Sequence, residues 1–443
     1  MSLLPQRVRP APVTAAVAIA FADSSIVVLA LPELYGRFDT TIQGVSWVVT
    51  SYNAAVAVTA LALVLFVHRL NAAAVLGAGL GIFLAASIAC AAAQSLEFLI
   101  GARAVQGVGA ALLLAGSLPL LGPGRWTAAG TFGLAVGPAL GGVLTQAFDW
   151  RAIFVAQAPV AGLALVAVVR AHYPHLEAEE GWKPSLALKV PANACLGLLF
   201  GALVGALFLA VLLVISVWDY SPIGGAVVVS ALPAAAVAAR SLERRLPRLT
   251  AVCGGAALLA LGLVGLALLP SARVGLAVWA LLLCGAGLGL AVPVLSNLTL
   301  DRGAGLARSG TLTVGARHLG LVVALAVIAP LLASKVPAAG DKALLRATAV
   351  LLDAPIGLDK KVPVALDLRG AFARAQAGET PNLAQPFNAH GARHDSALAH
   401  VRDQLLGAIE ATITRASRSA FFVCAGFAAL ALLLAALFRR RLA

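Results

Sequence analysis

The chain has 443 residues, of which 61% are hydrophobic and only 12% are charged. A soluble domain carries roughly 25% charged residues, so a soluble fold of this composition would expose a large apolar surface and aggregate. These numbers argue against a soluble enzyme and against a free nucleic-acid-binding domain. The net charge of +13 does not require a nucleic-acid partner, because Lys and Arg in a membrane protein first serve to fix its orientation.

A helix that crosses a bilayer needs about 20 mostly apolar residues, and in the membrane it must satisfy its own backbone hydrogen bonds. Twelve apolar runs approach this length, and we expect each to be a helix. The runs are 13–31, 45–67, 72–93, 97–121, 127–147, 152–169, 192–217, 222–239, 250–269, 274–299, 309–334 and 420–438. The sequence therefore predicts an all-α integral membrane protein with twelve transmembrane helices.

Neither the N-terminus nor the cysteines indicate processing or a disulfide framework. The first apolar run follows Met1–Pro12 and is long for the apolar part of a signal peptide, so we expect it to be the first helix. Every cysteine lies inside an apolar run without a CxxC pair, which is typical of small buried hydrophobic residues. The cysteines are Cys90, Cys195, Cys253, Cys284 and Cys424.

Basic residues predict the orientation, since cytoplasmic loops of membrane proteins are enriched in Lys and Arg. With the N-terminus inside, the cytoplasmic segments hold 16 basic residues and the short outer loops hold three. The 16 are Arg7, Arg9, Arg69, Arg125, Arg170, Lys183, Lys189, Arg240, Arg244, Arg245, Arg248, Arg302, Arg308 and Arg439 to Arg441; the three are Arg37, Arg151 and Arg273. We expect a multi-pass protein of the inner or plasma membrane with both termini in the cytoplasm.

Two polar stretches interrupt the series of spans. Residues 170–191 predict a cytoplasmic linker between two six-helix bundles, formed by residues 1–169 and 192–443. Residues 335–418 predict a long outer loop, since 19 of these 84 residues are charged. Proline and glycine between 355 and 386 favour an irregular segment in the middle of this loop.

An amphipathic helix is predicted near the end of the outer loop, over 397–418. Its apolar residues recur at helical spacing, at Leu398, Val401, Leu405, Ile409 and Ile413. Such a helix either packs on the protein or lies at the lipid interface. A separate binding module is the alternative.

Four ionisable residues fall inside predicted spans, where charge is costly and a functional role is the first hypothesis. They are Asp23, Arg103, Arg317 and His318. Burial can raise the pKa of a carboxyl such as that of Asp23 until it carries a proton at physiological pH. The alternative is a structural ion pair of Asp23 with Arg103, and the two roles can coincide.

The remaining three ionisable residues leave several roles open. Arg103 stays charged and needs a partner, and Gln106 lies near the same helix face. Arg317 either acts in the interior or extends to the membrane interface. His318 either titrates or packs as a hydrogen-bonded neutral side chain.

The fifth predicted span carries small residues at regular spacing. Glycines four residues apart form a flat stripe that allows close helix packing, and the proline adds a kink. These residues are Gly133, Gly137, Pro138, Gly141 and Gly142. A bent and tightly packed helix suits a gate or a seal between two halves.

At these residues the sequence resembles the drug:proton antiporter branch of the major facilitator superfamily. The segment from Asp23 to Pro32 is similar to the D-x-T-I-V-N-V-A-L-P motif of helix one, with Ser25 for Thr and Val28 for Asn. The segment from Arg103 to Ala111 is similar to R-x-x-Q-G-x-G-A-A of helix four. Further similarities lie at 47–52, 149–159, 220–233 and 317–320, so the resemblance covers nearly the whole chain.

The resemblance implies two six-helix bundles, proton coupling through Asp23 and Arg103, and exchange rather than symport through the motif at 133–142. The family's gate motif G-x-L-a-D-r-x-G-r-r departs most: residues 64–74 keep only Arg69 and place His68 at the acidic position. A relic survives at 240–246, with Glu243 at the acidic position. Many relatives have fourteen helices, whereas twelve are predicted here.

We therefore expect a monomeric, proton-driven exporter of lipophilic small molecules that works by alternating access in the lipid bilayer, without an enzymatic activity or a cofactor. Aromatic and polar residues near the expected cavity are Trp47, Tyr52, Phe154 and Gln157. Export of a native lipid or metabolite is the first alternative. A transporter-derived sensor or scaffold with a decayed gate motif is the second.

Overall fold

The computed structural model describes residues 10–170, 186–301, 305–374, 384–390, 392 and 395–439, and every regular element in these ranges is a helix. The first part of the chain forms α1 (Pro10–Val28), α2 (Leu31–Arg37), α3 (Ile42–Leu63), η1 (Val67–Arg69), α4 (Ala72–Ala91), α5 (Leu96–Ala147) and α6 (Arg151–Val169). The second part forms α7 (Leu186–Val211), η2 (Leu212–Val217), α8 (Pro222–Glu243), α9 (Arg248–Ala267), α10 (Val274–Thr299), α11 (Leu306–Asp353), α12 (Leu358–Arg374), α13 (Ala384–Ala389), α14 (Ser396–Ala416) and α15 (Arg418–Leu437).

In the described part of the chain, eleven helices are long and apolar enough to cross a membrane, and α5 provides two crossings. Gly122 has a φ of 72°, a left-handed conformation that glycine adopts at little cost and that reverses the chain. The Nε1 of Trp126 donates a hydrogen bond to the carbonyl of Leu114 at 3.3 Å, although a straight helix would separate residues 12 apart by roughly 18 Å. The fold thus has the twelve predicted spans.

Some helix bounds differ from the predicted runs. The first helix occupies 10–28 rather than 13–31, and the short α2 follows it. The predicted linker at 170–191 overlaps α7, which already begins at Leu186, while residues 171–185 lie outside the described residues. Hydropathy marks the apolar middle of a span, and a helix continues beyond it while its backbone hydrogen bonds remain available.

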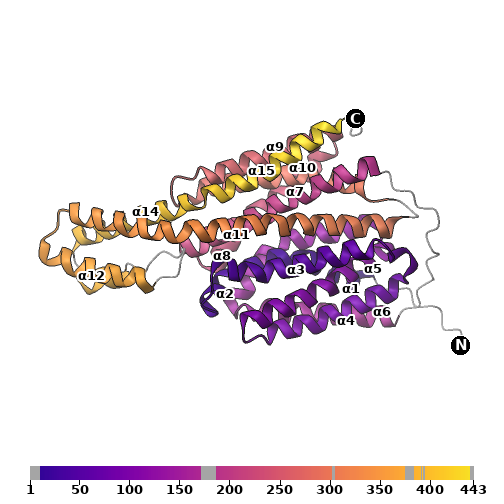
Figure 1. Ribbon diagram of the computed structural model, residues 1–443, viewed down its shortest axis with the longest axis horizontal. Coiled ribbons are helices and arrows are strands. Elements are labelled where there is room, and N and C mark those ends of the chain that lie inside the picture. Colours follow the sequence, from indigo (N-terminus) through magenta and orange to yellow (C-terminus); the bar gives the residue numbers. More distant parts are fainter. Residues whose placement is uncertain are drawn as a thin grey trace.

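The predicted outer loop is largely helical, and we call it the lobe: α11 beyond residue 334, together with α12, α13 and α14. Figure 1 shows the lobe projecting from one end of the bundle. The irregular segment predicted over 355–386 is wrong for 358–374, where α12 forms because Val364 and Leu368 are buried. The five apolar residues from Leu398 to Ile413 are buried on α14, which packs against α11.

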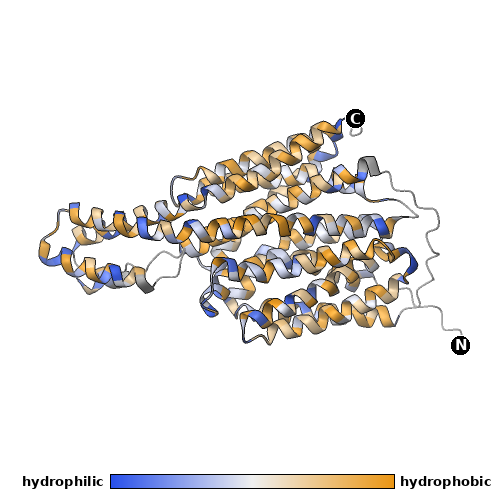
Figure 2. Ribbon diagram, viewed as in Figure 1, coloured by the Kyte–Doolittle hydropathy of each residue, from blue (hydrophilic) through white to orange (hydrophobic). Residues whose placement is uncertain are grey.

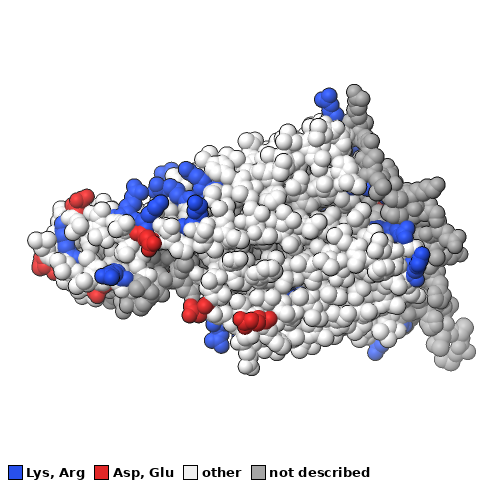
Figure 3. Space-filling model, viewed as in Figure 1, with Lys and Arg blue, Asp and Glu red and all other residues white. Residues whose placement is uncertain are grey.

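The body and the lobe differ in surface composition. Apolar residues dominate the helices of the body (Figure 2), and its visible face is almost free of charged atoms (Figure 3). Charged side chains gather at the two ends of the body and on the lobe (Figure 3). An uncharged band between charged ends is the surface expected of a protein embedded in a bilayer.

The first six spans contact the last six mainly through two helix pairs, α3 with α11 and α5 with α8. Along the first pair, Gly315 of α11 lies against Leu61 of α3. Along the second, Gln146 of α5 accepts a hydrogen bond from the backbone N–H of Ile223 at 2.9 Å. Polar residues of the two sets of spans meet along these pairs, for example Asn53 of α3 and His318 of α11.

Candidate functional site

A buried ion pair lies within the first six spans. Asp23 of α1 and Arg103 of α5 approach to 2.6 Å between carboxylate and guanidinium, and both side chains are fully buried. The other carboxylate oxygen of Asp23 accepts a hydrogen bond from Nε2 of Gln157 on α6 at 2.8 Å. The pair that the sequence suggested is therefore present, and a third helix holds it.

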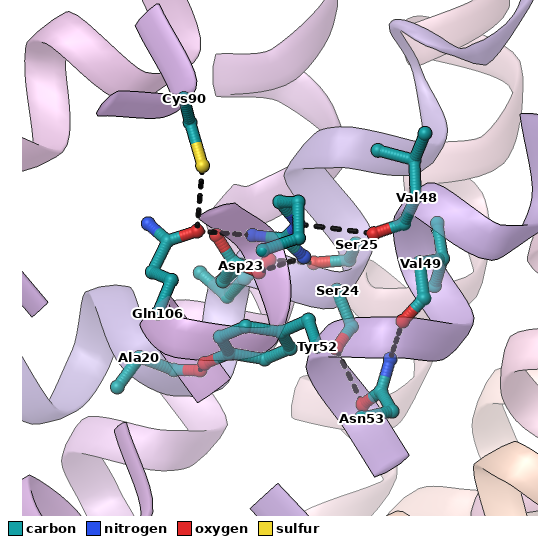
Figure 4. A network of polar contacts seen from close by, with 12 residues as sticks. Ala20, Asp23, Ser24, Ser25, Val48, Val49, Tyr52, Asn53, Cys90 and Gln106 are labelled. Atoms are coloured by element: carbon teal, nitrogen blue, oxygen red, sulfur yellow. Dashed lines mark hydrogen bonds and ion pairs between the residues drawn. The ribbon is translucent and has the colours of Figure 1, made fainter. Parts of the chain in front are cut away.

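Two carboxamides, Gln106 and Gln157, extend this pair into a network, and Figure 4 shows Gln106 beside Asp23. Gln106 accepts a hydrogen bond from Nη1 of Arg103 at 2.6 Å. Its Nε2 donates to Gln157 at 2.8 Å and to Ser87 of α4 at 2.9 Å. Arg103 also donates through Nε to the carbonyl of Val48 on α3 at 3.0 Å. Five helices thus meet at one polar network inside an apolar bundle.

Aromatic rings cover the guanidinium of Arg103. The ring of Tyr52 lies 4.3 Å from it and that of Phe154 lies 5.6 Å from it, which are cation–π distances. The Tyr52 hydroxyl donates to the carbonyl of Ala20 at 2.9 Å. Trp47, predicted beside the cavity, is 49% exposed on the surface of α3. Five residues along a helix rotate the side chain by about 140°, so Trp47 and Tyr52 face different directions.

Asp23 is the only carboxylate among the described residues of this network, and Arg103 has other acceptors nearby. The guanidinium also contacts uncharged groups, namely the Gln106 and Val48 oxygens and the Tyr52 ring. The ion pair with Asp23 is therefore one of several contacts that hold Arg103 in place.

A second buried cation lies on α11 among the last six spans. Arg317 is 6% exposed, donates through Nη2 to Ser296 of α10 at 2.6 Å, and lies 4.8 Å from the ring of Phe200 on α7. Its extension to the membrane interface is therefore wrong, because neighbouring helices enclose it. Across the described ranges, no acidic side chain lies within 4 Å of Arg317, and its Nε has no hydrogen-bond partner.

His318 connects the two sets of spans. Its Nδ1 lies 2.7 Å from Oδ1 of Asn53 on α3, and the same oxygen accepts a hydrogen bond from Ser24 of α1 at 3.0 Å. Asn53 donates in turn to the carbonyl of Val49 at 2.7 Å, which identifies Oδ1 as the acceptor and Nδ1 of His318 as the donor. The sequence reading missed Asn53, although it is the only carboxamide between residues 45 and 67.

The small residues of α5 face two partners. A Cβ at Gly133 would clash with the carbonyl oxygen of Ala18, and one at Gly141 would lie 2.5 Å from that of Ile26, both on α1. The side chain of Ser25 occupies the place of a Cβ at Gly137. Gly142 instead contacts Pro222 and Ala226 of α8. Three glycines therefore join α5 to α1, and Gly142, one turn beyond the buried Pro138, packs across to the other set of spans.

The region of the altered gate motif lies at the end of α3. His68 contacts Arg308 of α11 at 3.1 Å between Nε2 and Nη2. Arg69 is exposed on η1, and Glu243 is half-buried at the end of α8. In the part of the chain that the structure describes, neither of these two forms an ion pair. They are not brought together with the Asp23 network.

Two adjoining cavities lie between the sets of spans. The Arg317 cavity, of about 20 Å³, is lined by Phe21, Ser24, Ser25, Arg317 and His318. The α5–α8 cavity, of about 90 Å³, is lined mainly by apolar residues of α5, α7, α8 and α10, with Thr131 and Arg240 as polar members. Four residues line both cavities: Leu134, Phe200, Leu203 and Leu207.

Curated relatives match about a third of the chain. Methylenomycin A resistance protein of Bacillus subtilis is 32% identical over 160 residues, which are 33% of this chain and 34% of the relative. Multidrug resistance protein Stp of Mycobacterium tuberculosis is 34% identical over 157 residues, 33% of this chain and 29% of the relative. The matched region therefore spans about a third of the length of these relatives.

Solved structures share the fold along nearly the whole chain. A bacterial homologue of the human lysosomal transporter Spinster, inward-facing and occupied, has a TM-score of 0.63 at 16% identity and covers 95% of both chains. A nucleoside transporter, NupG, has a TM-score of 0.56 at 10% identity. Residues 13–325, more than half of the sequence, match the family described as Major Facilitator Superfamily. The chain belongs to this superfamily of membrane transporters.

Proposed function

We propose that this protein exports lipophilic small molecules from the cell in exchange for protons, acting as a monomer by alternating access. The buried Asp23–Arg103 pair carries the proposal. Ionisable side chains inside a membrane bundle cost free energy, so their presence there indicates a function. The names of the drug-resistance and efflux relatives support export of this substrate class.

The proposed cycle uses the network as a charge switch. A proton that enters from outside neutralises Asp23 and weakens its attraction to Arg103. Because Asp23, Arg103 and Gln157 lie on α1, α5 and α6, the loss of this attraction changes how these helices pack. Release of the proton on the other side restores the pair, and the exported molecule moves in the opposite direction to the proton.

Alternating access requires two helix interfaces that open in turn. The pairs α3–α11 and α5–α8 connect the two six-helix bundles proposed at 1–169 and 192–443, joined by the linker at 170–191. Asn53 and His318 link the first pair, whereas the second has close packing at Gly142. We propose that protonation of Asp23 favours separation at one pair over the other.

Proton-driven efflux from proteoliposomes tests this function. Asp23→Asn keeps the size of the side chain and removes its charge, and we expect substrate efflux to stop responding to an imposed pH gradient. Asp39→Asn is the matched control, because Asp39 is exposed and its left-handed φ of 42° suits asparagine. Undiminished coupled efflux by Asp23→Asn would rule out the proposed role.

We further propose that both termini and Glu243 face the cytoplasm and that the lobe lies outside. Single cysteines at Glu243 and Lys342, in a background without the five native cysteines, test this orientation. An impermeant maleimide should label Lys342→Cys in intact cells and Glu243→Cys only after permeabilisation. The reverse labelling would contradict the orientation.

Export of a native lipid is the second candidate. The α5–α8 cavity favours it, because its wall is almost entirely apolar and several of its residues, such as Val237, are partly exposed on the bundle surface. A membrane lipid reaches such a cavity from the bilayer without passing through water.

A further inference from the structure

We propose that the substrate is an amphiphile with one anionic group, which Arg317 binds while the apolar part occupies the α5–α8 cavity. This inference rests on the proposed export function and names the chemical class of its substrate. It excludes a lipophilic cation as the preferred substrate, and the binding experiment below tests this contrast. The argument has three parts: charge, free hydrogen-bonding capacity and the apolar wall.

The charges of the Asp23–Arg103 network and of Arg317 do not cancel. Asp23 and Arg103 neutralise each other, which leaves the charge of Arg317 without a counter-ion among the described residues. The groups that face Arg317 are neutral: the hydroxyl of Ser296, the ring of Phe200 and, more distantly, the ring of Phe21. A buried charge requires a partner, and an anionic ligand supplies one.

Arg317 also retains a free donor at the cavity. Its Nε has no hydrogen-bond partner, although the side chain is nine-tenths buried and lines the Arg317 cavity. A guanidinium binds carboxylate or phosphate oxygens through parallel N–H groups, so an unused Nε beside a cavity fits an oxyanion. The hydroxyl of Ser24, which also lines this cavity, already donates its only hydrogen to Asn53. Ser24 therefore has no hydrogen left to donate to an anion, and the free donor is that of Arg317.

The apolar wall accounts for the remainder of the ligand. Leu134, Phe200, Leu203 and Leu207 line both cavities, so an apolar chain can pass from the Arg317 cavity into the α5–α8 cavity. In the part of the chain that the structure describes, the charged residues that line the two cavities are Arg317 and Arg240, and Arg240 donates to Thr131 at 3.2 Å. No described acidic residue lines either cavity, so a cationic ligand would gain no attraction there.

The volumes indicate that the site is contracted. Cavities of about 90 and 20 Å³ are smaller than the roughly 300–1,000 Å³ of sites for drug-sized ligands. Binding therefore requires α5 and α8 to move apart at their shared cavity. This movement is one half of the alternating-access cycle, so the same step that opens the bundle exposes the apolar wall and Arg317.

Binding to the purified protein in nanodiscs of zwitterionic lipid tests the inference. The probes are octyl phosphate, octyltrimethylammonium and inorganic phosphate, with binding to empty nanodiscs subtracted. We expect octyl phosphate to bind at least about tenfold more tightly than the cationic probe, which is a modest value for one enclosed charge contact. Inorganic phosphate should not compete, because it lacks the apolar part.

Variants then identify the side chain that binds the anionic group of the probe. Arg317→Gln should remove the preference for octyl phosphate, and Arg317→Lys should retain part of it. The control Arg273→Gln removes an exposed positive charge elsewhere and should bind like the wild type. The inference is overturned if Arg317→Gln binds octyl phosphate normally, if Arg240→Gln alone abolishes binding, or if the cationic probe binds more tightly.

These outcomes are separate from those of the export proposal. Binding in nanodiscs needs no proton gradient, so Asp23→Asn should keep the anion preference while it loses coupled efflux. If Asp23→Asn transports normally and the preference remains, the coupling proposal fails and the substrate class stands. If proton-coupled efflux depends on Asp23 but the preference is absent, the substrate class fails and the export proposal stands.

Discussion

The two buried arginines of the bundle occupy opposite electrostatic situations. Arg103 has a carboxylate at 2.6 Å, a carboxamide, a backbone carbonyl and two aromatic rings around it. Arg317 has a serine hydroxyl and an aromatic ring, and no carboxylate within 4 Å among the described residues. Similar burial thus accompanies a compensated charge in the first six spans and an uncompensated charge in the last six.

Under the proposed function, this difference gives the Asp23–Arg103 network and the Arg317 site different tasks. A compensated pair stays stable in the resting protein and changes when a proton arrives, which suits coupling. An uncompensated cation stays incomplete until another molecule contributes the negative charge, which suits recognition. Asn53 lies between them, since it accepts from Ser24, next to Asp23, and from His318, next to Arg317.

The largest effect on stability should come from breaking the compensated pair. Arg103→Gln leaves the Asp23 carboxylate buried with Gln157 as its remaining partner, and loss of one member of a buried pair costs about 3–5 kcal/mol. We expect this loss in the free energy of unfolding at neutral pH, measured by titration with SDS in mixed micelles. The additional change Asp23→Asn should recover part of it. A single variant as stable as the wild type would show that the pair does not hold the bundle.

A smaller effect should follow from separating the helices that carry the pair. Gly133→Ala places a methyl group against the carbonyl of Ala18, and such overpacking typically costs about 1–3 kcal/mol. The matched control is Gly101→Ala, because a Cβ there meets no atom within 4 Å and alanine favours a helix. We expect lower stability and weaker proton coupling only in Gly133→Ala. Equal behaviour of both variants would contradict a close α1–α5 contact.

Removing the uncompensated charge should change stability less. Arg317→Gln gives up the hydrogen bond to Ser296 but relieves a cost of roughly 2.5–3.5 kcal/mol for a charge in the membrane interior. We expect unfolding within about 1 kcal/mol of the wild type, in the same SDS titration as Arg103→Gln. A loss as large as that of Arg103→Gln would mean that an undetected partner compensates Arg317.

The sequence pointed to the residues of the Asp23–Arg103 network more clearly than to the residues around Arg317. Asp23, Arg103 and Gln106 stand out because they are polar residues inside apolar runs, and they belong to motifs with fixed spacing. Phe200 and Ser296 carry no such signal, since a phenylalanine or a serine in a transmembrane helix is ordinary. Their relation to Arg317 exists only after α7, α10 and α11 have packed together.

The fold shows the same division between local and tertiary information. Hydropathy predicted the spans and the break between the runs 97–121 and 127–147, where Gly122 lies, because each is a property of its own segment. The extension of α11 to Asp353 and the helix α12 depend on burial between neighbouring helices, which outweighs the proline and glycine pattern. Trp47 lies on the exposed side of α3, whereas the polar residues Ser46, Thr50 and Asn53 recur at helical spacing and mark its buried side.

The smallest effect should come from an ion pair of equal length in the lobe. Lys360 of α12 and Asp395 at the start of α14 lie 2.6 Å apart, as do Arg103 and Asp23, but both are partly exposed. The hydrogen bond from Lys360 holds the pKa of Asp395 below its ordinary value, so the pair contributes above that value and its contribution is lost as the pH falls through the lowered pKa. Asp395→Asn keeps the acceptor for the N–H groups of Ala397 and Leu398 that begin α14.

Because water screens an exposed pair, Asp395→Asn should leave the melting temperature at pH 7 unchanged within error, measured in detergent. Asp395→Ala also removes the helix cap and should lower it measurably. Both pairs have the same distance between their charged groups. The comparison with Arg103→Gln therefore shows how burial, rather than distance, changes the contribution of an ion pair to stability. If Asp395→Asn destabilised the protein as strongly as Arg103→Gln, burial would not explain the importance of the Asp23–Arg103 pair, and the contrast between the compensated and uncompensated arginines would lose its basis.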